Sequence, residues 1–227
     1  MFIQIIIIFY IILMIYFLYT NQKYNYNGYI VKTDNYTDIF NNILKLNPVI
    51  FRGDIVKGGI NNIINKDENF LIESKIFNLK NYEEKDYIHI YKNKEIIKDK
   101  YIEDLINFDF NKVPNNHFNI IKTQSLTILK GEHSYSIKTS YHNVNLICIL
   151  DGESTFYLFN PKHDKEIKNK ENKSIKKWGH KKQVKKNEIL FIPPYWKYIQ
   201  EVNNNVIQLH IDIDNLFCFI PNFVKDY

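Results

Sequence analysis

One pair of residues in this chain has the spacing of metal ligands. Seven histidines occur among the 227 residues, and only His210 is followed two positions later by a carboxylate, Asp212. A His-x-Asp pair on a strand points both side chains to one face, where a further histidine could complete a metal site. No histidine follows Asp212. Residues 208–214 alternate polar with apolar side chains, so we expect a solvated face of a half-buried strand there.

Other catalytic patterns are missing from the sequence. It has no CxxC pair, no glycine-rich phosphate loop, no GxSxG and no HExxH motif. The two cysteines, Cys148 and Cys218, lie in the apolar runs LICIL and LFCFI. Such surroundings are typical of buried free thiols rather than of a disulfide or a nucleophile. Zinc-ribbon and thioredoxin-like sites are therefore excluded.

The chain begins with an apolar segment. Residues 2–19 contain one polar residue, Gln4, and no charge. Eighteen helical residues span about 27 Å, close to the roughly 30 Å hydrocarbon core of a bilayer. A signal peptide would need an early basic residue and a small-residue cleavage site, and Lys23 is the first basic residue. We expect a single-pass membrane anchor over residues 1–20, with a signal peptide or a buried helix as alternatives. Lys23 and Lys32 follow this segment, so the positive-inside rule favours a cytoplasmic location for the rest of the chain.

Positive charge is concentrated in residues 162–186. This segment holds eleven lysines and three acidic residues, a net +8 in a chain whose total is +5. We expect a solvated, Lys-rich loop there that could contact anionic lipid headgroups or an acidic protein. Nucleic acid is not expected, because Trp178 is the one aromatic residue there for base stacking. The candidate contacts are Lys176, Lys177, Lys181, Lys182, Lys185 and Lys186.

The chain contains no alanine, and this bias in composition is consistent with an AT-rich genome.

The elements that would position these residues change in period along the chain. A polar connector is expected over 21–33. Apolar stripes at helical spacing predict helices over 37–46 and 100–108, and a short strand follows the first at 47–55. From Leu126 onward the period is two, and turn signals separate six or seven short runs, which favours an antiparallel sandwich or barrel. The runs are 125–131, 133–141, 143–150, 154–161, 188–194, 198–202 and 206–214.

Three of these motifs, in their order, resemble the cupin-like JmjC family of Fe(II) and 2-oxoglutarate oxygenases. They are LNPVIFRGDI (46–55), NLICILDGESTFYLFNP (145–161) and VKKNEILFIPPYWKY (184–198). The similarity covers about residues 44–223. It implies a double-stranded β-helix, a cupin-type jelly roll with helices packed outside. We therefore expect a mainly β fold with flanking helices (α+β) over residues 34–227, preceded by the single transmembrane helix.

The resemblance also implies where the metal would sit, and the ligands are absent there. The family's His-x-Asp/Glu pair falls on Thr139 and Tyr141, and its distal histidine falls on Tyr198. Its basic residue for 2-oxoglutarate falls on Ser154. A tyrosine brings bulk and a hydroxyl that stays neutral near pH 7. Fe(II) and 2-oxoglutarate, which the family uses, are thus predicted to be lost.

Three functions remain open from the sequence. We expect a membrane-anchored, non-catalytic binding or structural module, a pseudoenzyme. An atypical 2-oxoglutarate-dependent oxygenase, resembling a protein hydroxylase, would need His142 or His210 as a replacement ligand. His142 lies one residue past Tyr141, so a register slip would bring it inward but would flip the whole strand. The third possibility is a non-oxygenase enzyme or a binder of a small polar ligand that reuses the pocket. Its candidate pocket residues are Ser136, Thr139, Tyr141, Asn145, Ser154 and Tyr198.

Overall fold

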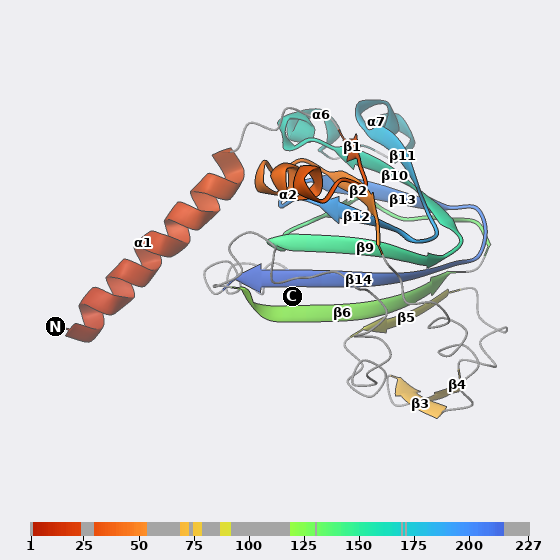
Figure 1. The fold of residues 1–227 in the computed structure, drawn as a ribbon, viewed down its shortest axis with the longest axis horizontal. Helices are drawn as coiled ribbons and strands as arrows, with labels where there is room; N and C mark the ends of the chain where they lie inside the picture. The colour runs from red at the N-terminus through yellow and green to blue at the C-terminus, as the bar shows by residue number, and fades with distance from the viewer. Residues whose placement is uncertain are drawn as a thin grey trace.

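Two facing β-sheets form the body of the protein (Figure 1). The computed structural model describes residues 2–23, 30–53, 69–72, 75–78, 87–91, 119–129, 131–168, 170 and 172–215. Within these ranges the larger sheet has the strand order β1-β2-β12-β9-β14-β6-β5. Its strands are β1 (Val31–Lys32), β2 (Val49–Arg52), β12 (Glu188–Ile192), β9 (Val144–Asp151), β14 (Val206–Asn215), β6 (Asn119–Leu129) and β5 (Tyr87–Tyr91).

The smaller sheet has the order β11-β10-β13-β7, and β8 also pairs with β13. Its strands are β11 (His180–Lys185), β10 (Glu153–Phe159), β13 (Lys197–Val202), β7 (His133–Ser134) and β8 (Lys138–Thr139). A separate hairpin joins β3 (Asn69–Ile72) to β4 (Lys75–Asn78). Every described strand pair is antiparallel except β1 and β2.

The order in which the chain visits the two sheets defines the fold. From β6 onward the strands fall in the larger sheet (β6), the smaller (β7 and β8), the larger (β9), the smaller (β10 and β11), the larger (β12), the smaller (β13) and the larger (β14). This alternation is a jelly roll, in which two antiparallel sheets enclose one interior. The predicted mainly β, cupin-like fold is therefore confirmed.

The helices are few and mostly short. They are α1 (Phe2–Lys23), α2 (Tyr36–Leu44), η4 (Pro161–His163), α6 (Asp164–Ile167), α7 (Asn172–Ile175) and η5 (Lys176–Trp178). The helix predicted over 37–46 is confirmed as α2. Asn35 is the N-cap of this helix, and its side chain accepts a hydrogen bond from the Thr37 N–H at 3.0 Å. The helix predicted over 100–108 lies outside the described residues. The side chains of α1 are described over 3–16, and no helix described in this way is both long and apolar enough to cross a membrane.

The sequence-based boundaries differ from the structure in two places. Residues 21–33, expected as a connector, contain the end of α1 and the strand β1. The Lys-rich segment, expected as a loop, ends in strand β11, which pairs with β10 from Glu153↔Lys185 to Leu158↔His180. That part of the prediction is wrong. β11 is an edge strand whose one buried residue is Val184, so it lacks the alternation of a half-buried strand.

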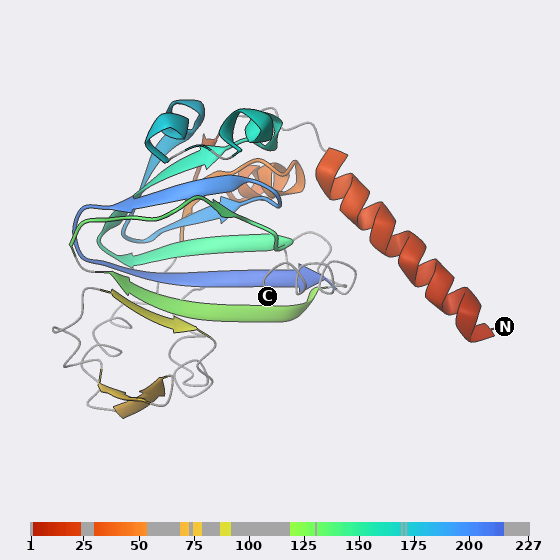
Figure 2. The ribbon, with the colours of Figure 1, turned by 180° about the vertical axis from the view of Figure 1, so that it is seen from behind.

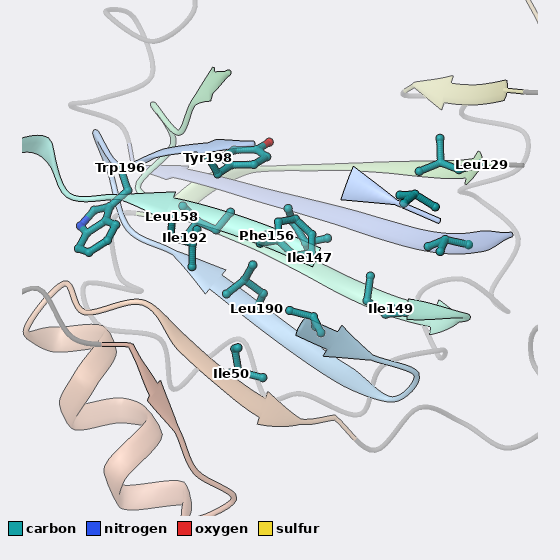
Figure 3. Packing of buried hydrophobic residues seen from close by; sticks show 13 residues of the cluster. Ile50, Leu129, Ile147, Ile149, Phe156, Leu158, Leu190, Ile192, Trp196 and Tyr198 are labelled. Carbon is teal, nitrogen blue, oxygen red and sulfur yellow. The ribbon is translucent and has the colours of Figure 1, made fainter. Parts of the chain in front are cut away.

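An apolar core fills most of the space between the sheets (Figure 3). Its buried residues are Ile50, Leu129, Ile147, Ile149, Phe156, Leu158, Val184, Leu190, Ile192, Trp196, Tyr198, Val202 and Val206. A second cluster holds α6 and α7 against the other face of the smaller sheet through Phe159, Ile167, Ile175 and Ile199. Fully burying one such side chain contributes about 1.5–3 kcal/mol. These two clusters give the walls of the barrel a fixed shape.

The turn between β9 and β10 requires glycine. Gly152 has φ +79°, and a Cβ there would lie 2.2 Å from the backbone oxygen of Asn205. A side chain at this position would meet both the left-handed strain and a clash with backbone. This glycine thus fixes the hairpin that connects the two sheets.

Candidate functional site

The interior of the barrel changes from apolar to polar along strand β14. Gln208, His210 and Asp212 line a cavity between the sheets, and Leu209 lies on the opposite face. Gln208 is 2% and Asp214 5% exposed. The expected solvated face over 208–214 is therefore wrong: the polar side chains point into the barrel, and the apolar ones are buried on the outside of the sheet.

Register explains why polar groups from three strands meet there. In the β14–β6 pairing, Gln208 lies opposite Thr127 and His210 opposite Ser125. In the β14–β9 pairing, Asp212 lies opposite Asn145. Directly opposed residues on neighbouring strands share a face, so all of these side chains reach the same cavity. The larger sheet contributes one wall of hydroxyl, amide, imidazole and carboxylate groups.

The cavity has a volume of about 320 Å³. Thirteen residues line it: Ser125, Thr127, Tyr135, Lys138, Thr139, Tyr141, His142, Asn145, Tyr198, Gln200, Gln208, His210 and Asp212. Every one of them carries a polar group. The volume is at the lower end of small-molecule sites, which suits a ligand of metabolite size.

The structure brings together four of the six predicted pocket residues. Thr139, Tyr141, Asn145 and Tyr198 line the cavity. Three of these are the positions where the resemblance puts the metal ligands. Ser154 is buried but does not line the cavity, and it accepts a hydrogen bond from the lining residue Gln200 (Nε2) at 3.0 Å.

The other predicted position, Ser136, is exposed and does not line the cavity. Sequence reasoning also missed lining residues on β6, β8 and β13, such as Lys138 and Gln200. The alternation in 208–214 did carry a signal for Gln208, but it was assigned to the solvent side. A period of two shows that a strand has two faces without showing which one encloses a cavity.

A pair of glutamines joins the two sheets at the base of the cavity. Gln200 Nε2 lies 2.6 Å from Gln208 Oε1, and Gln208 Nε2 lies 3.2 Å from Gln200 Oε1. Gln208 Nε2 is also 2.9 Å from His210 Nε2. Buried polar groups with partners of this kind hold a fixed arrangement, since breaking one bond leaves its partner unsatisfied. The base of the site is therefore preorganised.

His142 lies at the rim and is tied to the end of β14. Its Nδ1 is 2.7 Å from Asp214 Oδ2, and its Nε2 is 3.7 Å from Asp212 Oδ2. The Asn143 N–H donates to Asp214 Oδ1 at 3.2 Å. His142 occupies a turn between β8 and β9, so it reaches the cavity without the strand flip expected from the sequence. This correction follows from the local backbone, because a turn has no period-two constraint.

Burial shifts the pKa values of two lining residues. Burial, together with the nearby negative charge of Asp212, raises the pKa of Tyr198 well above its ordinary value. Its phenol stays neutral, so it offers no anionic ligand where the resemblance puts a metal histidine. Burial also lowers the pKa of Lys138, whose ammonium is partly removed from water. The site thus disfavours isolated charge.

The donor set does not fit the family's iron. Thr139, Tyr141 and Tyr198 stand at the ligand positions, and their hydroxyl groups are poor ligands for Fe(II) at neutral pH. Across the part of the chain that is described, no group of three or more His, Cys, Asp or Glu side chains is placed to share a metal ion. The carboxylates nearest His142 are engaged with that imidazole.

Comparison with known proteins finds only distant structural likenesses. No protein-family model matches the sequence, and no curated protein sequence matches it either. A cupin superfamily protein from Desulfitobacterium hafniense is 16% identical with a TM-score of 0.31, over 41% of this chain and 68% of its own. The cupin domain of Schizosaccharomyces pombe Cnp3 is 14% identical with a TM-score of 0.30, over 41% of this chain and 52% of its own.

A conserved protein of unknown function from Streptococcus pyogenes is 9% identical with a TM-score of 0.35, over 64% of this chain and 93% of its own. The match thus spans about half of the Cnp3 domain but most of the streptococcal protein. Likenesses this distant carry no argument about ligand or activity. The jelly-roll assignment rests on the strand order, and any functional statement has to come from the cavity.

The side-chain oxygen of Asn145 has no hydrogen-bond partner among the described residues. Asn145 is 6% exposed, and its Oδ1 accepts no hydrogen bond from any described residue. A buried acceptor without a partner costs about 1–3 kcal/mol. The orphaned oxygen belongs to a cavity-lining residue, so a donor group on a bound molecule would satisfy it.

Proposed function

We propose that this chain is a non-catalytic binding protein whose jelly-roll cavity takes a small polar ligand. The observation that carries the proposal is the buried Oδ1 of Asn145, which no described residue hydrogen-bonds, in a cavity of about 320 Å³. A ligand hydroxyl or amine would donate to this oxygen. The glutamine pair supports such a role, because it holds the base of the site rigid before a ligand arrives.

The chemistry of the lining favours a neutral, hydroxyl-rich ligand such as a monosaccharide or polyol. Each hydroxyl both donates and accepts, and the lining offers both roles through amides, hydroxyls and imidazoles. One cationic side chain, Lys138, and one anionic side chain, Asp212, face the cavity, so the lining has little net charge. The phenol rings of Tyr135 and Tyr141 add flat surfaces against which a sugar ring could pack.

We also propose that the domain is held at a membrane by its first helix. Apart from Gln4 and the hydroxyl groups of Tyr10 and Tyr16, the side chains of residues 3–16 are apolar and uncharged, so no face of α1 is polar. Ile3, Ile8 and Ile12 are 72%, 57% and 57% exposed. A helix that is apolar all round needs an apolar environment, and a bilayer provides one. Lys23 at the end of this helix favours a cytoplasmic body.

The second candidate function is an oxygenase with unusual metal ligation. The observation behind it is that His142, His210 and Asp212 all line the same cavity, although in this structure they are not placed to share a metal ion. Stoichiometric iron together with 2-oxoglutarate turnover would support this candidate over the binding protein.

The binding proposal is tested by calorimetry and thermal stabilisation of the full chain in detergent. The probes are monosaccharides, polyols, amino acids and 2-oxoglutarate, each with and without Fe(II). We expect saturable binding of at least one hydroxylated probe, weakened about ten- to a hundredfold by Asn145→Leu, which leaves a ligand donor unpaired.

A matched pair of variants controls for general effects on the fold. Thr139→Ala changes a cavity residue and should weaken binding, whereas Ser136→Ala makes a similar change outside the cavity and should not. If no probe binds, or if binding ignores both Asn145→Leu and Thr139→Ala, the proposed ligand site is wrong.

A further inference from the structure

A basic surface surrounds Trp178, where η4, η5 and the start of β11 come together. We call it the Trp178 patch and define it as Lys162, His163, Lys177, Trp178, His180 and Lys182. None of these residues lines the cavity. The patch is therefore a separate feature of the molecule, at the end that carries α6 and α7 in Figures 1 and 2.

An exposed indole stands at the centre of the patch. Trp178 is 38% exposed, its ring centroid lies 5.6 Å from that of His163, and Lys177 Nζ lies 5.6 Å from the indole centroid. The neighbouring segment is firmly seated. Ile175 is fully buried, and a Cβ on Gly179 would lie 2.8 Å from the Phe159 ring, so the backbone lies directly against the sheet. The indole is thus held on a rigid base.

The structure separates paired lysines from lysines that face solvent. Lys176 forms an ion pair with Glu201, and Lys186 Nζ lies 2.6 Å from Asp151 Oδ1. Two of the six lysines selected from the sequence are therefore neutralised locally.

In contrast, Lys162, Lys177 and Lys182 are exposed, and no carboxylate of a described residue forms an ion pair with them. Burial, followed by the positive charges of Lys162 and Lys182 and by His163, lowers the pKa of His180. That shift reports that several cationic groups lie close together.

We propose that the Trp178 patch is a docking surface for an anionic lipid bilayer, with the indole at headgroup level and the three exposed lysines among the headgroups. Tryptophan is enriched at membrane interfaces because its ring is apolar and its N–H is polar. Lysine ammonium groups are compact point charges that suit a mobile anionic surface. A single-stranded nucleic acid would call for several aromatic platforms, and the patch offers one.

The tether to α1 agrees with this partner. Residues 24–29 join α1 to Ile30, and six extended residues span at most about 20–22 Å. If α1 sits in a bilayer, as proposed above, the body cannot move far from the surface. This supporting step depends on the membrane role of α1, whereas contact between the patch and headgroups does not.

The test places the full chain in phosphatidylcholine vesicles and in vesicles with 30% phosphatidylserine. The chain has two tryptophans, and Trp196 is fully buried, so changes in emission and in quenching by brominated lipids report Trp178. Trp178→Phe provides the background signal. We expect a blue shift and quenching in the anionic vesicles and neither in the neutral ones. Flotation on both vesicle types measures insertion of α1 separately.

Charge variants give the quantitative test. Each lysine near an anionic surface contributes about fivefold in partitioning, so Lys162→Gln, Lys177→Gln and Lys182→Gln together should weaken docking about a hundredfold. The matched control is Lys45→Gln, Lys185→Gln and Lys186→Gln, which removes the same charge elsewhere. Lys185 lies three residues, about 10 Å, along β11 from Lys182, the patch residue nearest to it on that strand, which is beyond the screening length of about 8 Å at physiological salt. The control should therefore keep the signal.

Two further results would overturn the proposal. One is a Trp178 signal that is equal in neutral and anionic vesicles, or that 1 M salt leaves unchanged. The salt measurement uses the unmodified chain, so it does not depend on whether a variant folds. The other is tight binding of heparin or single-stranded DNA to the patch with no response to anionic lipid, which would assign the surface to an acidic macromolecule instead.

Discussion

Replacing Asn145 with leucine should make the protein more stable while it weakens ligand binding. The side chain is 6% exposed, and its Oδ1 has no hydrogen-bond donor among the described residues. Leucine has the same number of non-hydrogen atoms and removes that buried acceptor, and the adjoining cavity of about 320 Å³ leaves room for its slightly larger methyl groups. We expect the free energy of unfolding to rise by about 1–3 kcal/mol, the cost of one unsatisfied buried group.

The assay is urea unfolding of the full chain in detergent, followed by circular dichroism. With a slope of about 2 kcal/mol per molar urea, the midpoint should rise by roughly 0.5–1.5 M. The matched control is Gln200→Leu, which also converts a buried amide into leucine. Gln200 is bonded to Ser154 and Gln208, so this change leaves two buried partners without that bond and should lower the free energy of unfolding by about 2–6 kcal/mol.

The two variants must therefore move in opposite directions. A fall in stability for Asn145→Leu, similar to that of Gln200→Leu, would refute the reasoning, because it would mean that the folded protein itself satisfies Oδ1. A rise in stability with unchanged affinity for the hydroxylated probe would keep the stability argument and reject the role of Asn145 in binding.

Three further predictions concern the turn, the cavity lysine and the patch histidine. Gly152→Ala should lower the free energy of unfolding, measured with urea, by about 3 kcal/mol or more. Gly131→Ala, at φ +69° with nothing within 4 Å of the added Cβ, should lower it by only about 1–2 kcal/mol. Equal losses would contradict the clash with Asn205. Because burial lowers the pKa of Lys138, more of its amine is neutral at pH 8, so mass spectrometry should find it acylated at lower pH than Lys45, and a bound probe should slow the reaction. The pKa of His180 is lowered in the folded state, so protonation of its imidazole favours the unfolded state, and the urea midpoint should fall as pH drops below about 6.5. If His180→Gln leaves this pH dependence unchanged, other titrating groups cause it.

Much of the fold could be predicted because its signals are local. The apolar stripe that forms α2 and the alternating runs that form β9, β10, β12, β13 and β14 are contained in short stretches of sequence. Gly152 marks its turn by itself, since only glycine tolerates that backbone next to Asn205. Strand β11 escaped detection because an edge strand exposed on both faces has no alternation to read.

Part of the candidate site could be predicted from the sequence. Thr139, Tyr141, Asn145 and Tyr198 were placed in one pocket by a resemblance in motif order, and the structure brings these four to the cavity. Their polar neighbours on β6 and β14 were not found. A strand shows which of its residues share a face, but the opposite sheet decides whether that face becomes core, cavity or surface.

The sequence by itself indicated most of the strands after Leu126 and their turns. It also determined the absence of histidines at the positions that the resemblance gives to iron, and the excess of lysine in one segment. Tertiary structure alone decided that Gln208 and His210 point into the barrel, and that no described residue hydrogen-bonds Asn145 Oδ1. It also decided that Lys176 is paired while Lys177 is exposed. The reason is that burial and pairing depend on groups far apart in the chain, such as Lys176 and Glu201. Local patterns carry no information about which distant residue will lie opposite.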